Sequence, residues 1–271
     1  MSTIGKRYRE MNDINVLFRK RIGLNSKEPI TLENLAGILE LTASAIPFEN
    51  LCTLSGDPGE LNEDSLVDKI LHRNEGGLCY DLNGVLYLFL KENGLDVQMI
   101  RGAVYVPELN GFSPTGLTHA AIILNDDGNR YLVDTGFGGN LPLRPVSLDG
   151  SEIMTPTGEF RVRKEESEFG DYFLEMKLQN KDTDWRIGYA FESRQPVENI
   201  GDLTEMKKII TEHPQSAFNK KPLLTRVTAN GSMVLTESSF TRWKDGQVTK
   251  EEIDSSKFKQ LAKEHYNLDV K

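Results

Sequence analysis

The chain has 271 residues, 38% of them hydrophobic, which is enough for buried cores in one large domain or two to three smaller ones. Its net charge of −9 argues against nucleic acid as the main partner. No apolar run approaches the ~20 residues of a membrane-spanning helix, and the start of the chain lacks the apolar core of a secretory signal. We therefore expect a cytoplasmic protein with no membrane partner.

The order of sequence patterns predicts an α+β protein. Apolar residues recur at helical spacing up to Asn93-Gly94, which is typical of a helix end. Short alternating segments broken by Gly, Pro, Asn and Asp then predict a β-sheet or barrel up to residue 195. Beyond residue 195 the pattern mixes again, with helices predicted near 202–213 and 255–266 and strands between them. The pattern therefore divides the chain into segments at residues 1–93, 94–195 and 196–271.

Cysteine is scarce, and one of the two lies where a glycine turn meets a predicted helix. In "NEGGLCYDLN", Cys79 follows Gly76 and Gly77 and begins an apolar helical stripe. Free backbone N–H groups and the helix dipole at such a position favour a thiolate. Cys79 is therefore either a nucleophile or a small packing residue, which is the more common role of a free cysteine. Cys52 has neither a glycine turn nor a helix start beside it, and we expect it to be a packing residue. Two cysteines and no Cys-x-x-Cys or His-x-x-x-His pair predict neither a disulfide framework nor a metal site.

A nucleophilic cysteine needs a base, and a predicted hairpin offers one. Two apolar runs flank "NDDGN", with His119 before the turn and Asp134 after it. A turn centred on Asp127-Gly128 places His119 diagonal to Asp134, and a turn one residue earlier places them directly opposite. Both registers put the two side chains on one face, because strand side chains alternate. The pair is either a general base with its orienting carboxylate or an incidental cross-strand contact.

Four ordered motifs resemble the arylamine N-acetyltransferase family. The family pattern has an arginine, two glycines, the nucleophilic cysteine after one further residue, and then an acidic residue and an asparagine at alternate positions. Here "GGLCYDLN" supplies Gly76, Gly77, Cys79, Asp81 and Asn83. The segments "IPFENL", "THAAIIL" and "YLVDTGFG" are also similar to the family, and the likeness is clear over about residues 10–145.

The resemblance implies a helical bundle carrying Cys79, an antiparallel β-barrel carrying His119 and Asp134, and an α/β lid around a cysteine-protease-like Cys-His-Asp core. It implies ping-pong acetyl transfer from acetyl coenzyme A, through a Cys79 thioester, to arylamines, hydrazines or arylhydroxylamines, as in xenobiotic metabolism.

By the same resemblance, specific residues are expected to bind the substrates. Cofactor contacts are expected from the "GFGG" loop, namely Gly136, Phe137, Gly138 and Gly139, which corresponds to the family segment near the coenzyme A pyrophosphate. Thr118, Phe137 and Phe218 are expected to line the acyl or acceptor pocket. Neither a metal nor a nucleic acid is expected, and the oligomeric state is left open.

The sequence departs from the family pattern at Glu75, which stands where the arginine is usual. That arginine pairs with a carboxylate such as Glu49, so Glu75 would reverse the sign of the contact unless Arg73 replaces it. Other functions remain as alternatives: a thiol protease or transglutaminase-like enzyme with the same three residues, an amide synthase of the same family with another acyl donor, or a catalytically weak or non-enzymatic binder.

Overall fold

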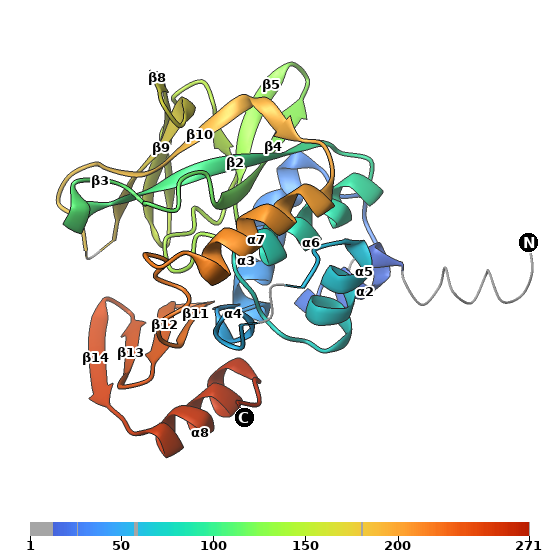
Figure 1. Ribbon diagram of the computed structural model, residues 1–271. Coiled ribbons are helices and arrows are strands. Elements are labelled where there is room, and N and C mark those ends of the chain that lie inside the picture. Colours follow the sequence, from blue (N-terminus) through green and yellow to red (C-terminus); the bar gives the residue numbers. More distant parts are fainter. Residues whose placement is uncertain (1–12, 26, 57–58, 180, 271) are drawn as a thin grey trace, which may run out of the picture.

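The computed structural model describes residues 13–25, 27–56, 59–179 and 181–270. Its first part is helical, as predicted, and α6 lies at the centre of this part, with residues 79–86 all buried (Figure 1). The other helices and the barrel strands β2 and β4 supply apolar partners, so that α6 is covered on most sides. The helical elements are α2 (Ile14–Ile22), α3 (Leu32–Ala45), α4 (Leu51–Leu54), α5 (Glu63–Leu66), the π-helical segment η1 (Val67–His72) and α6 (Cys79–Glu92).

The central part is a strongly curved antiparallel sheet. Its strands follow the order β6-β5-β4-β2-β10-β9-β8-β7, and β6 lies close to β8, so the sheet nearly closes into a barrel. A short strand, β3, pairs with β2 outside this path. The predicted antiparallel barrel is therefore confirmed. Its strands are β2 (Asp96–Val106), β3 (Gly111–Phe112), β4 (His119–Asp126), β5 (Asn129–Val133), β6 (Val146–Ser147), β7 (Ile153–Thr155), β8 (Gly158–Ser167), β9 (Gly170–Leu178) and β10 (Arg186–Val197), with a 3-10 turn, η2 (Pro107–Leu109), after β2.

The β4–β5 hairpin adopts the first of the two predicted registers. Asp126 pairs with Asn129, which leaves Asp127 and Gly128 as a two-residue loop in which both have positive φ. This loop type matches the natural twist of paired strands, and glycine and aspartate tolerate it. His119 and Asp134 consequently lie on one face in the diagonal arrangement.

The C-terminal part adds a second sheet and two longer helices. This sheet has the order β1-β11-β12-β13-β14, and its first strand, β1 (Phe48–Glu49), comes from the helical part of the chain. In Figure 1 the strands β11–β14 and the last helix form a layer apart from the barrel. The remaining elements are η3 (Ile200–Asp202), α7 (Leu203–Glu212), β11 (Leu223–Thr228), β12 (Gly231–Thr236), β13 (Ser239–Lys244), β14 (Gln247–Glu252) and α8 (Ser255–Tyr266).

Strand β14 is not visible in the hydrophobic pattern, since all its residues are exposed. It forms because Asp245 and Gly246 adopt positive φ in a two-residue loop that returns the chain along β13. The predicted domain limits at residues 93 and 195 remain a prediction. Over the residues described, none of the helices combines the length and apolar character needed to cross a membrane.

Candidate active site

Cys79 is the first residue of α6, as predicted. Leu78 is the extended N-cap residue, and the Cys79 side chain lies in the buried core. The two preceding glycines are required by close packing. A Cβ atom at Gly76 would lie 2.2 Å from the carbonyl oxygen of Pro47, and one at Gly77 would lie 2.4 Å from Asp81 Oδ2. The backbone that approaches the glycine turn is therefore that of Pro47, and the turn leads directly into the helix that carries the thiol.

His119 lies between Cys79 and Asp134. Its Nε2 atom is 2.8 Å from Asp134 Oδ2, and its side chain also forms a hydrogen bond with Cys79. Since Nε2 is engaged by the carboxylate, Nδ1 is the ring nitrogen left for the thiol. Burial alone would lower the pKa of His119, but the Asp134 carboxylate and these hydrogen bonds outweigh it and raise the pKa from 6.5 to about 10. The site therefore favours an imidazolium beside the sulfur.

The Asp134 carboxylate is held by several donors besides His119. Asn83 Nδ2 lies 2.8 Å and the N–H of Gly136 lies 2.7 Å from Oδ1, while the Tyr189 hydroxyl lies 2.9 Å from Oδ2. Burial would raise the pKa of Asp134, but His119 and the hydrogen bonds from Asn83 and Gly136 lower it below its usual value. The carboxylate is consequently ionised and fixed in one orientation.

Tyr189 was not predicted from the sequence. It lies on β10, which β2 and β4 separate from β5 in the barrel order, and its hydroxyl reaches Asp134 directly after β5. Its hydroxyl is fully buried and its ring lies 4.4 Å from the His119 ring, between ring centroids. The alternating pattern of the "WRIGYAFE" segment predicts that this tyrosine is an ordinary core residue. Nothing in the pattern indicates that it contacts the catalytic candidates.

The "GFGG" loop packs directly on Cys79. A Cβ atom at Gly136 would lie 2.6 Å from the Cα atom of Cys79, so the backbone of this loop contacts the first turn of α6. The ring of Phe137 contacts both His119 and Tyr189, at centroid distances of 5.3 and 5.0 Å. The loop thus covers the imidazole with an apolar surface.

The other predicted binding residues lie at different distances from this centre. The carbonyl oxygen of Thr118 is 3.5 Å from Cys79 Sγ, so Thr118 borders the thiol. Phe218 packs edge-on against Phe48 at a centroid distance of 5.6 Å, and Phe48 in turn lies beside Gly138. Phe218 therefore reaches the loop through Phe48.

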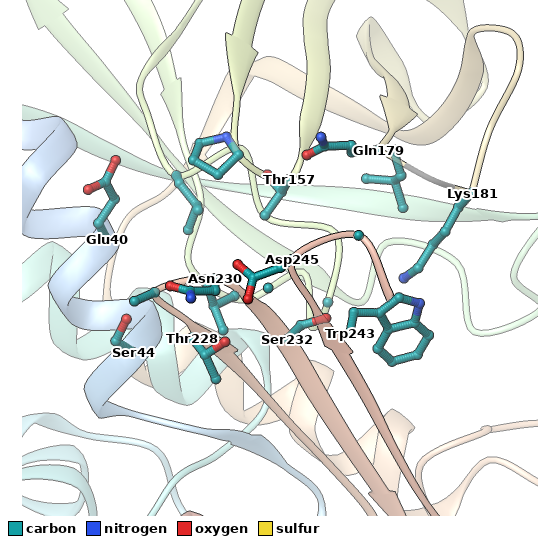
Figure 2. Close-up of a pocket in the computed structure, with 18 of the residues that line it drawn as sticks. Glu40, Ser44, Thr157, Gln179, Lys181, Thr228, Asn230, Ser232, Trp243 and Asp245 are labelled. Carbon is teal, nitrogen blue, oxygen red and sulfur yellow. The ribbon is translucent and has the colours of Figure 1, made fainter. Parts of the chain in front are cut away.

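A cavity of about 520 Å³ lies beyond Gly139, between α3, the barrel loops and the C-terminal sheet. Figure 2 shows Glu40 and Ser44 on one side, Thr157 and Gln179 on the barrel side, and the tip of the β13–β14 hairpin opposite them. Lys181 Nζ lies 4.6 Å from the centroid of the Trp243 ring on this wall. Beside Gly138, the buried Thr225 hydroxyl has no hydrogen-bond partner among the described residues.

Beside burial, which is the larger cause, the negative charge of Glu75 helps to raise the pKa of Glu49, so the like-charge contact expected here is present. Glu75 is partly exposed and forms a 2.9 Å ion pair with Arg73. The cation that acts on buried Glu49 is Lys69, whereas Arg73, the alternative considered for this place, pairs with Asp68 and Glu75. Lys69 was not singled out in the sequence, because a lysine in an apolar helical stretch normally faces solvent.

Comparison with known proteins gives one consistent result. The N-acetyltransferase family profile matches residues 31–271. An uncharacterized acetyltransferase of Bacillus subtilis is 40% identical over 241 residues, covering 89% of this chain and 92% of its own. A probable arylamine N-acetyltransferase of Dictyostelium discoideum is 35% identical, covering 91% of this chain and 89% of its own.

A solved arylamine N-acetyltransferase from Bacillus cereus, described as having a unique Cys-His-Glu catalytic triad, is 36% identical. It superimposes with a TM-score of 0.89, and the match covers 95% of this chain and 99% of that one. Sequence and fold therefore agree over nearly the whole length. The chain belongs to the arylamine N-acetyltransferase family and is an acyltransferase.

Proposed function

We propose that the protein transfers acetyl groups from acetyl coenzyme A, through a thioester on Cys79, to arylamines, hydrazines or arylhydroxylamines. The observation that carries this proposal is the buried chain of hydrogen bonds from Cys79 through His119 to Asp134. A thiol at a helix N-terminus beside an imidazolium is the usual setting of a nucleophilic cysteine. Cys79, His119 and Asp134 are then the catalytic residues.

In the first half-reaction, the Cys79 thiolate attacks the carbonyl carbon of the acetyl thioester. The new sulfur–carbon bond forms as the bond to the coenzyme A sulfur breaks, and His119 gives its proton to the departing thiolate. Free coenzyme A leaves, and the enzyme keeps the acetyl group with a neutral imidazole. Asp134 stays ionised throughout and holds the ring in place.

In the second half-reaction, the amine nitrogen attacks the Cys79 thioester and passes a proton to His119. The Cys79 thiolate leaves, the amide is released, and the thiolate–imidazolium pair is restored. Because coenzyme A departs before the amine reacts, the two substrates use the enzyme in turn. Phe137 and the buried surroundings keep water away from the thioester, which favours transfer over hydrolysis.

The cavity next to Gly139 is the natural place for the coenzyme A part of the donor. Gly139 lines this cavity and has no atom of the described residues within 4 Å of where a Cβ would lie, so the backbone there is open to a ligand. The N–H of Gly136 is already used by Asp134, so Gly138 and Gly139 are the better candidates for donor contacts. We assign the acyl and acceptor side of the site to Thr118, Phe137 and Phe218.

Aspartate is the third catalytic residue in this proposal, whereas the similar protein from Bacillus cereus is described with glutamate. The donors Asn83, Gly136 and Tyr189 fit the shorter carboxylate here, since each lies within 2.9 Å of it. Orientation of His119 by a carboxylate is the common requirement.

Intact-protein mass measurement after mixing with acetyl coenzyme A tests the proposal. The enzyme should gain one acetyl group and release about one equivalent of free coenzyme A in a burst. Peptide mapping should place the acetyl group on Cys79, and adding an aminobenzoate or a hydrazide should clear it. Cys79→Ala should stay folded and form no adduct, whereas Cys52→Ala should retain both adduct and activity.

Three results would contradict the proposal. Amide formation by Cys79→Ala at the wild-type rate would remove the acyl carrier. Intersecting double-reciprocal lines with no adduct at millisecond quench times would point to direct transfer within a ternary complex. Reaction with other acyl thioesters but not with acetyl coenzyme A would instead assign the protein to amide synthesis.

A further inference from the structure

A buried cluster of charges lies beneath the first turn of α6. The side chains of Lys69 and Asp81 are only 10% and 4% exposed, and Lys69 Nζ lies 2.9 Å from Asp81 Oδ2. The same oxygen accepts the backbone N–H of Leu78 at 3.1 Å. Leu78 directly precedes Cys79, so the ion pair is attached to the backbone from which the thiol projects.

A second carboxylate, Glu49, holds the other side of this segment. Its Oε2 atom accepts the N–H of Leu51 at 2.6 Å, and its own backbone N–H donates to the carbonyl oxygen of Gly77 at 3.0 Å. Burial raises the pKa of Glu49, and the positive charge of Lys69 opposes that rise. Burial alone would lower the pKa of Lys69, but Asp81 and Glu49 outweigh it and raise the pKa, so the ammonium stays charged.

Lys69 reaches the interior because of its local backbone. It belongs to the π-helical segment η1, and such wider turns are often found at functional sites. Its neighbours on the chain, Val67, Ile70 and Leu71, are buried as well. A buried ion pair is weak evidence for stability, because the cost of removing both charges from water offsets their attraction. A gain in stability therefore does not explain why a buried ion pair lies directly beneath Cys79.

We propose that Lys69 is a positioning residue of the acyl-transfer site, which holds Asp81 and the first turn of α6 so that Cys79 stays within hydrogen-bond reach of His119. This inference rests on the proposed function, in which Cys79 is the nucleophile. Lys69 acts through Asp81 and Leu78 and does not itself contact the sulfur. Lys69 lies in η1 and supplies a positive charge near Glu49. The arginine that the family pattern has at position 75 would supply this charge, but here that residue is Glu75.

Lys69→Met tests the inference, with the rate of Cys79 alkylation by iodoacetamide measured as a function of pH. Displacement of the thiol from His119 should lower this rate at neutral pH by about 10- to 100-fold and move the midpoint of the profile upward. The kcat/KM of acetyl transfer should fall by a similar factor. Arg73→Met is the matched control, because it removes an exposed cation from the same stretch and should leave both rates unchanged.

Two further variants separate positioning from folding. Lys69→Arg keeps the charge and should retain most of the alkylation rate. The double variant Lys69→Met with Glu75→Arg brings a cation back toward Glu49 and should recover part of the rate lost in the single variant. If Lys69→Met fails to fold, Asp81→Asn replaces it, since the amide can still accept the Leu78 N–H and should lower the alkylation rate in the same way.

A folded Lys69→Met protein with the wild-type alkylation profile would overturn the inference, as would an equal loss in Arg73→Met. Such a result would leave the proposed function untouched, provided that the wild-type enzyme still forms the Cys79 adduct with acetyl coenzyme A. Absence of that adduct in the wild type would instead remove the proposed function, whatever the Lys69 variants show.

Discussion

Asn83 donates a 2.8 Å hydrogen bond to Asp134, which joins the helix that carries Cys79 to the hairpin that carries His119. The same amide group donates to the carbonyl oxygen of Ala120, and its oxygen accepts the N–H of Thr135. Asn83 is fully buried. One side chain, with both its donor and its acceptor ends used, therefore links the start of α6 to strand β4 and to the residues directly after β5.

Asn83→Asp is the sharpest test of that link. A carboxylate of the same size cannot donate to Asp134, and the two like charges would raise the pKa of Asp134. We expect kcat/KM for acetyl transfer to fall by about 100-fold at neutral pH and to recover partly as the pH is lowered, because a protonated residue at position 83 can donate again. A pH profile parallel to that of the wild type would contradict this role.

Asp134→Asn should lower the reactivity of Cys79 by about three to four orders of magnitude, since the imidazole loses its orientation and its charge support. Iodoacetamide alkylation of Cys79 at varied pH reports this directly. An unchanged alkylation profile in Asp134→Asn would exclude the catalytic assignment.

Tyr189→Phe removes one hydrogen-bond donor from the ionised Asp134. The rate of Cys79 alkylation should fall by about tenfold, which corresponds to the loss of one hydrogen bond to a charged group.

The raised pKa of His119 predicts how stability depends on pH. Protonated His119 stabilises the folded state fully below its ordinary pKa of 6.5, and this contribution is lost as the pH rises toward about 10. The difference in unfolding free energy between the wild type and His119→Gln should therefore shrink between these two values. Urea unfolding of both proteins at about pH 6, 8 and 10 measures it. A difference that stays constant between pH 8 and 10 would show that the imidazole is neutral in the folded protein over this range.

Gly136 and Gly139 provide a matched pair of glycine substitutions. Gly136→Ala places a methyl group 2.6 Å from Cys79 Cα, and we expect a loss of about 1–3 kcal/mol in unfolding free energy together with reduced acetyl transfer. Gly139→Ala meets no atom within 4 Å, so its stability should not change. If Gly139 lines the donor site, the KM for acetyl coenzyme A should rise in that variant. Equal melting temperatures for Gly136→Ala and the wild type would contradict the packing argument.

The residues that could be predicted from the sequence are those whose local pattern determines their geometry. Cys79 starts a helix because a glycine turn precedes an apolar stripe, and His119 and Asp134 share a face because strand side chains alternate. The sequence alone allows two hairpin registers. The structure resolves the choice at Asp127 and Gly128, where both residues take positive φ.

Lys69 and Tyr189 could not be predicted, because their roles arise from tertiary packing. Lys69 lies in a π-helical segment, which the local sequence pattern does not predict. Its partners Asp81 and Glu49 lie on two other elements of the chain. Tyr189 reaches Asp134 across 55 residues of sequence through the strand order of the barrel. Strand alternation predicts that Tyr189 faces the interior, but it does not predict that its hydroxyl contacts Asp134.

The pairing of β1 with β11 has a consequence for how the protein is made. Asn50, directly after β1, accepts the N–H of Leu223, which lies 173 residues later in the chain. On its other side, β1 holds the carbonyl oxygen of Gly77, two residues before Cys79. On the ribosome, His119 and Asp134 therefore emerge long before the segment that completes the support of the thiol. The β1–β11 contact can form only after residue 223 has been synthesised, so a shorter chain already contains Cys79, His119 and Asp134 without this support.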